Sequence, residues 1–202
     1  KNLKRVLADE QNDVLQVLRG RPPVLSLAAI VPDSEEHNRR YADAISQELL
    51  QAAQAGAASV VDTDDQRPGV TEASTFAAAI DAIAVSIVEP LRDRLDRAIG
   101  VADGDNDELA SLTRTVYREW KTIRIDAQLD HVVRLAFGHG ALAALRAGTR
   151  VCWAVDPNGP ACPDAEDNAL AGAVRAGEPF PTEHTCAPAH EGCRCMLLPV
   201  GR

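Results

Sequence analysis

The stretch CAPAHEGCRC, residues 186–195, places three cysteines and a histidine within ten positions of a chain that has only five cysteines among 202 residues. All five cysteines lie between residues 152 and 195. A disulfide framework that stabilises a whole chain would spread its cysteines along it, so this clustering predicts one local site. The odd number also leaves at least one thiol outside any intramolecular pair.

The sequence around this stretch loses the helical pattern of the preceding residues. After Gly148 a β-favouring segment, TRVCWAV, leads into DPNGPACPDAED, a Gly- and Pro-rich stretch, and finally CRCMLLPV. We expect residues 149–202 to form a small, loop-rich α+β unit, with strands near Val151–Val155 and Cys195–Val200. A region with so few large apolar residues needs a cross-link to remain folded.

Thiols and imidazoles are the side chains available for such a cross-link. Zinc prefers these ligands, and four of them in tetrahedral geometry would join the early loop to the C-terminal tail. A disulfide from Cys162 to Cys193 or Cys195 is the chief alternative, and free thiols are the third; spacing alone leaves all three open. The candidate metal ligands are Cys162, Cys186, His190, Cys193 and Cys195, with Cys152 and His184 in reserve.

Residues 1–148 carry apolar side chains at helical spacing, which predicts a mainly α fold with a helical body before the C-terminal unit. We expect helices over about 1–20, 33–56 and 71–100, the last kinked or restarted at Pro90, and a loop at DTDDQRPGV, residues 62–70. Two further stripes follow, in a hairpin or one long bent helix, and Asp105 or Asn106 caps the first of them. The stripes contain Leu109, Leu112, Val116 and Trp120, and then Leu129, Val133 and Phe137.

Charge and hydropathy exclude several classes of protein. The net charge is −9, with 30 acidic against 21 basic residues, so we expect at most local contact with DNA. No window approaches the roughly 20 apolar residues of a membrane span, and the start lacks the apolar stretch of a signal peptide. The first residue is Lys1 rather than Met, which leaves room for further sequence before it.

The C-terminal region resembles the signature of the Mu-F-like phage minor head proteins, also called head morphogenesis proteins. That signature runs from a Trp and an Asp through C-P-x-C to P-P-x-H-P-x-C-R-C. Two departures stand out: Ala165 replaces the second cysteine of C-P-x-C, and Glu191 replaces the proline after His190. The matching positions are Trp153, Asp156, Cys162, Pro163, Pro188, His190, Cys193, Arg194 and Cys195.

The resemblance implies a structural role in a tailed bacteriophage. Proteins of this family are minor capsid components associated with the portal, which implies portal, major capsid or scaffold proteins as partners and several copies around the portal. It also implies a function in procapsid assembly and in DNA packaging or ejection. The expected location is the virion, inside the capsid near the portal, and the host cytoplasm during assembly.

An enzyme is the main alternative, because zinc-bound water can perform hydrolysis. A zinc-dependent hydrolase or toxin-like domain would need an open coordination position and a general base, for which Asp164, Glu166 and Glu191 are candidates. Acidic residues on a polar loop are usually solvated. The sequence therefore favours a protein that is not an enzyme.

Overall fold

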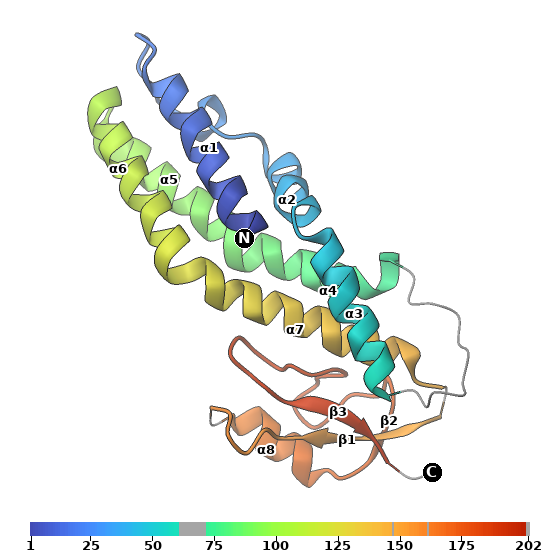
Figure 1. Cartoon of the computed structure of the whole chain (residues 1–202). Coiled ribbons are helices and arrows are strands. Elements are labelled where there is room, and N and C mark those ends of the chain that lie inside the picture. The colour runs from blue at the N-terminus through green and yellow to red at the C-terminus, as the bar shows by residue number, and fades with distance from the viewer. Residues whose placement is uncertain (61–71, 147, 161, 201–202) are drawn as a thin grey trace. The chain divides into compact units, whose positions relative to one another are not determined.

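The chain is predominantly helical up to residue 144 and ends in a small sheet, as the computed structural model shows (Figure 1). The structure describes residues 1–60, 72–146, 148–160 and 162–200. The predicted fold class, mainly α with a loop-rich α+β end, is confirmed. Within the described residues, no helix combines the length and apolar character needed to cross a lipid bilayer.

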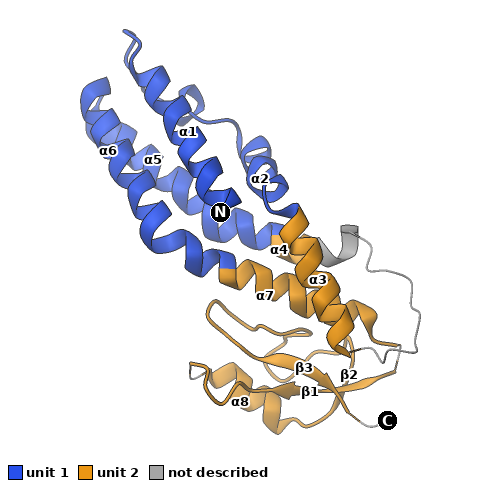
Figure 2. Ribbon diagram, in the orientation of Figure 1, with its two compact units in different colours: residues 1–46, 80–129 blue, residues 47–79, 130–202 orange. Residues whose placement is uncertain are grey.

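Backbone contacts group the chain into two compact units (Figure 2). Unit 1 comprises residues 1–46 and 80–129, and unit 2 comprises residues 47–79 and 130–202. Residue 148, where the sequence predicts a domain boundary, marks the change from helix to strand. The compact units instead divide near the start of α3 (Ser46–Val60) and inside α7 (Ile125–Ala144), and near the end of α4 (Glu72–Ile83).

Unit 1 is a set of helices that pack through the predicted apolar stripes. In α1 (Asn2–Leu18) the buried residues Leu3, Leu7, Val14 and Leu18 follow the 3.6-residue period. This helix contacts α6 (Asn106–Glu119), which in turn contacts α5 (Glu89–Ala102). A short 3₁₀ turn (Leu27–Ala29) and α2 (Ser34–Asp43) connect α1 to unit 2.

A buried carboxylate lies in the interior of unit 1. Glu10 falls on the apolar stripe of α1 and is 1% exposed. Its Oε1 accepts hydrogen bonds from the hydroxyls of Tyr41 (3.1 Å) and Tyr117 (2.8 Å), and its Oε2 lies 2.8 Å from His37 Nε2. Arg92 Nη1 lies 3.1 Å from the other ring nitrogen of His37. Each charged or polar group of this cluster therefore has a partner, which offsets the cost of burying it.

Two helix predictions in the first half of the chain are wrong in detail. Asp33 does cap a helix, its Oδ1 accepting from Glu36 N–H, but the expected single helix over 33–56 is divided into α2 and α3 at Ala44–Ile45. Gly56 does not end α3 and lies in its interior. The predicted loop at 62–70 and the expected start of the next helix at residue 71 fall outside the described residues.

Both long helical stretches contain a π-helical segment. The first, Ala84–Val88, ends just before Pro90, where the missing N–H and the ring oppose a regular α-helix. The second, Trp120–Arg124, joins α6 to α7 without a loop, so these residues form one interrupted helix and not a hairpin. Asp105 caps α6 as expected, through Asp107 N–H and Glu108 N–H.

In unit 2, α3 and α7 approach each other closely at glycines. A Cβ on Gly56 would overlap the carbonyl of Phe137, and one on Gly140 would overlap the carbonyl of Ala53. Only glycine, which has no Cβ, lets the two helix backbones come this close. This requirement explains why Gly56 lies in the interior of a helix.

The C-terminal part of unit 2 contains a three-stranded antiparallel sheet in the order β2-β1-β3. The strands are β1 (Arg150–Ala154), β2 (Val174–Arg175) and β3 (Met196–Pro199), and Trp153 lies opposite Leu197 in the pairing of β1 with β3. Helix α8 (Pro163–Leu170) packs beside β1. Sequence analysis anticipated β1 and β3, but not β2 or α8.

Candidate metal centre

Three cysteine thiols from two distant segments converge in unit 2. Cys162 precedes α8, whereas Cys193 and Cys195 lie immediately before β3, and the three sulfur atoms all lie within 4.8 Å of one another. Cys162 and Cys193 are buried and Cys195 is half-buried. The predicted link between the early loop and the C-terminal tail thus has its side chains in place.

His190 adds a fourth donor beside this group. Its Nε2 lies 2.9 Å from Cys162 Sγ, and its Nδ1 lies 2.7 Å from the carbonyl oxygen of Glu191. A carbonyl oxygen only accepts hydrogen bonds, so Nδ1 carries the proton and Nε2 presents a lone pair. A backbone contact of this kind orients the imidazole of a metal-binding histidine. We therefore treat Cys162, His190, Cys193 and Cys195 as the cluster.

Local backbone geometry explains how these residues meet. Cys162 is the N-cap of α8, and its Sγ accepts from Ala165 N–H at 3.3 Å. On the other side, a turn is closed by the hydrogen bond from Cys193 N–H to His190 O (3.1 Å), with Gly192 at a φ of 80°. Glycine adopts this left-handed conformation without steric cost. The turn places His190 and Cys193 on the same side, facing α8.

Two thiols of the cluster, those of Cys162 and Cys195, lie in an environment that disfavours the thiolate form. Burial raises the pKa of Cys162, and the neighbouring Cys193 raises it further, although Ala165 N–H acts in the opposite direction. Burial also raises the pKa of Cys195 to about 11, while the indole N–H of Trp153 favours its thiolate. A bound divalent cation would reverse this balance, because it stabilises several thiolates at once.

The sulfur geometry fits a metal better than a disulfide. Thiolates at about 2.3 Å from a tetrahedral metal stand roughly 3.8 Å apart, whereas a disulfide requires about 2.05 Å. All five cysteines lie in the described part of the chain, and all five are free thiols. Cys162, Cys193 and Cys195 are thus close enough to bind a metal ion together.

The apolar core beside the cluster is small. Trp153 is 3% exposed and contacts Phe180 edge to face, with ring centroids 5.2 Å apart. Trp153 is thus the aromatic anchor of this region. The other buried members are Val151, Cys162, Ala165, Ala187, Cys193 and Leu197. Because two cluster cysteines belong to this core, a metal there would stabilise packing as well as chain topology.

The structure does not bring the remaining candidate residues into the cluster. Cys186 is buried elsewhere in unit 2, where its thiol donates to Ala187 O at 3.2 Å and burial raises its pKa to about 12. Cys152 is half-buried in β1, and His184 Nδ1 lies 2.8 Å from Thr182 Oγ1. Among the predicted ligands from residues 186–195 outside the three converging cysteines, it is His190 and not Cys186 that approaches Cys162.

Sequence reasoning missed two features that support the site, the role of Cys162 as a helix cap and the buried contact of Asn168. Pro163 and the acidic residues Asp164 and Glu166 are a standard signal for a helix start, and they identify Cys162 as a cap. Asn168, on α8, is fully buried and accepts from both the N–H and the hydroxyl of Thr182, so it ties this helix to the following loop. No sequence pattern identifies that contact.

Comparison with known proteins gave no match: no family model matches the chain, and neither a curated protein nor a solved structure is significantly similar to it.

Proposed function

We propose that this chain is a structural protein of a tailed bacteriophage, a minor head protein whose C-terminal residues 149–202 are held together by one zinc ion. The observation that carries the proposal is that residues matching the minor head protein signature come together at one site. Cys162, His190, Cys193 and Cys195 form the cluster, and Trp153 lies in the core beside it. These residues were matched to the signature from their order in the sequence alone.

Zinc is the metal that this donor set favours. Three thiolates and one imidazole make a Cys₃His set, which is typical of structural zinc sites, whereas magnesium and calcium require oxygen ligands. The orientation of His190 by the Glu191 carbonyl matches the support that zinc-bound imidazoles receive in such sites.

A structural role for the metal follows from the number of donors. Four protein ligands complete a tetrahedron and leave no position for a water molecule, which a hydrolytic zinc requires. Glu166 and Glu191 are exposed, so neither lies in a desolvated position typical of a general base. We therefore favour assembly over catalysis.

The partners we propose are the portal protein and the major capsid or scaffold proteins, with several copies of this chain near the portal inside the capsid. The net charge of −9 suits contacts between proteins better than the coating of packaged DNA. Within this role the cluster would keep the C-terminal part folded as an attachment module.

Genetic replacement in the genome that encodes the chain tests this function. Cys193→Ser should leave synthesis of the major capsid protein intact and reduce infectious particles to the level of a deletion of residues 150–202. Cys152→Ser is the matched control, because this thiol lies outside the cluster. Immunoblotting of purified heads should detect the wild-type chain. Its absence from heads, or a normal particle yield from the deletion, would refute the proposal.

A further inference from the structure

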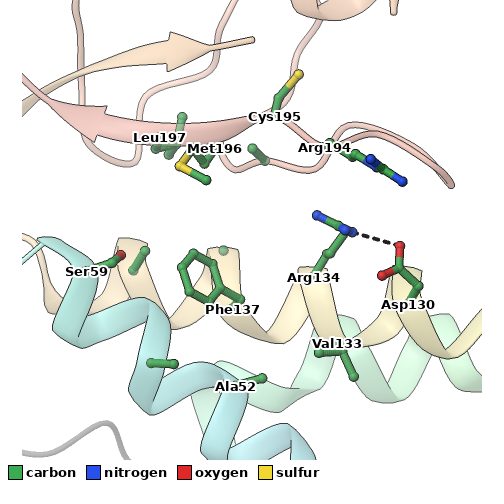
Figure 3. Close-up of a pocket in the computed structure, with 14 residues that line it drawn as sticks. Ala52, Ser59, Asp130, Val133, Arg134, Phe137, Arg194, Cys195, Met196 and Leu197 are labelled. Carbon is green, nitrogen blue, oxygen red and sulfur yellow. Dashed lines mark hydrogen bonds and ion pairs between the residues drawn. The ribbon is translucent and has the colours of Figure 1, made fainter. Parts of the chain in front are cut away.

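An apolar groove lies in unit 2, beside the cluster, and Cys195 is among the residues that line it. It encloses about 470 Å³ between α3, α7 and the start of β3 (Figure 3). This volume falls in the range of sites that bind small molecules or short peptide segments. The groove, as we use the term, is lined chiefly by Ala52, Ala55, Val133, Phe137, Met196 and Leu197.

The groove leaves a predicted core stripe incompletely covered. Val133 and Phe137 belong to the apolar stripe that the sequence assigns to the interior of α7, yet both are only half-buried. Met196 faces the same space and is 46% exposed. An apolar helix stripe opposite an exposed apolar strand residue is a typical feature of a binding surface.

The strand that borders the groove has an open edge. Among the described residues, β3 pairs only with β1 in the order β2-β1-β3, and no residue of β1 lines the groove. The hydrogen bond from Val200 N–H to Arg150 O shows that the backbone groups of Val200 point at β1. Backbone groups alternate in direction along a strand, so those of Leu198 and Met196 also point at β1. Leu197 therefore directs its N–H and C=O to the open edge.

Proline limits how a further strand can pair with this edge. Pro199 is the next outward-pointing residue after Leu197, and it has no N–H to donate. Pairing is thus restricted to the neighbourhood of Leu197, beside the groove. An edge with one available pairing position accepts a short segment but resists indefinite sheet growth.

Positive charge lies at one end of the groove. Arg194 and Arg134 both line it at this end, where Arg134 forms an ion pair with Asp130 at 2.8 Å (Figure 3). Arg194 is exposed and has no acidic partner among the described residues. In a protein of net charge −9, an unpaired arginine beside an apolar groove selects an acidic ligand group.

From these features we propose that the groove binds an extended segment of another protein, which adds as a strand to β3 at Leu197. An apolar side chain of the segment packs on Val133 and Phe137, and an acidic side chain pairs with Arg194. Main-chain hydrogen bonds supply affinity and alternate side chains supply specificity, as in other cases of strand addition. The inference rests on unit 2 alone and does not depend on the phage assignment.

An array of hexapeptides that alternate Val, Ile, Leu or Phe with Asp or Glu provides the probes. We expect the full chain to bind acidic members, and to bind otherwise identical Lys or Thr members at least about tenfold more weakly. N-methylation of the backbone amides in the best peptide should abolish binding, because it removes the donors of an added strand without changing side chains. Failure of every acidic peptide to bind at about 1 mM would overturn the proposal.

Two variants, each with a matched control, test whether the peptide binds in the groove. Arg194→Glu should weaken the best peptide about tenfold or more, whereas Arg175→Glu, an equal charge change on β2, should have no effect. Ala55→Trp should obstruct the groove from α3, whereas Ala58→Trp, exposed on the same helix outside it, should not. Unchanged metal content and melting temperature serve as the folding control.

Three results would contradict the proposed occupant. Equal binding of the N-methylated peptide would exclude strand addition. Equal binding to Arg194→Glu would exclude the acidic contact. A concentration-dependent dimer in sedimentation, lost in Ala55→Trp, would show that a second copy of this chain fills the groove.

Discussion

Unit 1 and the C-terminal part of unit 2 each bury a cluster of polar, ionisable side chains, but they support it by different means. In unit 1, Glu10 is satisfied by two tyrosines and a histidine, inside helices that bury many large aliphatic residues. In unit 2, the cluster lies beside a small core whose largest member is Trp153. We therefore expect the first cluster to depend on the fold around it, whereas under the proposed function the fold around the second would depend on a bound metal.

Loss of the metal ligands should have the largest effect, and it should be confined to one region. Cys193→Ser removes a buried ligand, and structural zinc contributes on the order of 10 kcal/mol to small domains of this kind. We expect hydrogen exchange to show loss of protection over residues 149–200 while α1, α5 and α6 stay protected. Cys152→Ser is the control. Uniform loss of protection in both units would break the comparison.

Removal of the aromatic anchor should have the next largest effect. Trp153→Ala should cost about 3–5 kcal/mol, since the indole is buried against Phe180 and Leu197. Thermal unfolding, monitored by far-ultraviolet circular dichroism of the backbone, measures this loss of stability. Leu198→Ala, on the exposed face of β3, should change stability little. An unchanged melting temperature for Trp153→Ala would mean that the core adds nothing to the metal.

In unit 1, removal of the buried carboxylate should lower the stability of the fold, and the size of this loss should not depend on the presence of metal. Glu10→Ala leaves the hydroxyls of Tyr41 and Tyr117 without their acceptor, which we expect to cost about 3 kcal/mol. Asp9→Ala, at an exposed position of the same helix, is the matched control. If a chelator destabilised unit 1 as much as this substitution does, the expectation that the stability of unit 1 does not depend on metal would be refuted.

Acid should reveal a smaller effect of the same carboxylate. Burial raises the pKa of Glu10, but hydrogen bonding and charge interaction with His37, aided by Tyr117 and Tyr41, lower it below its ordinary value overall. A carboxyl with a lowered folded pKa stabilises the fold above its unfolded pKa of about 4.3, and loses this contribution as the pH falls through the folded value. Wild-type stability should therefore decline below about pH 4 more steeply than that of Glu10→Gln. If the stability of wild type and of Glu10→Gln fell in parallel with pH, Glu10 would be excluded as the origin of the acid sensitivity.

The sequence predicted the helices of unit 1 better than the details of unit 2, for a physical reason. Stripes such as Leu3, Leu7 and Val14 repeat at the period of the helix, so local pattern and buried face coincide. The position of Glu10 on that stripe was a readable sign of a buried polar cluster. Pro90 indicated an interruption near the first π segment, whereas no residue pattern predicted the break at Ala44–Ile45 or the π geometry of Trp120–Arg124.

In the candidate site, the clustering of cysteines was sufficient to predict that side chains able to bind a metal would lie close together, but not which residues they would be. Four of the five proposed ligands meet, whereas Cys186 is held beside Gly138, where a Cβ would contact its sulfur at 3.2 Å. That placement follows from the close approach of α7 to the C-terminal loops, which spacing along the chain cannot reveal. The cap role of Cys162 was readable from Pro163 and the acidic residues after it.

Metal analysis combined with thiol counting tests the central claim most directly. The chain should be purified without chelator, its zinc measured by elemental analysis, and its thiols counted after denaturation with and without reductant. The account predicts about one zinc per chain and all five cysteines as free thiols, with the zinc lost in Cys193→Ser and retained in Cys152→Ser. No zinc with one or three free thiols would establish a disulfide instead, and no zinc with five free thiols would contradict any cross-link at this cluster.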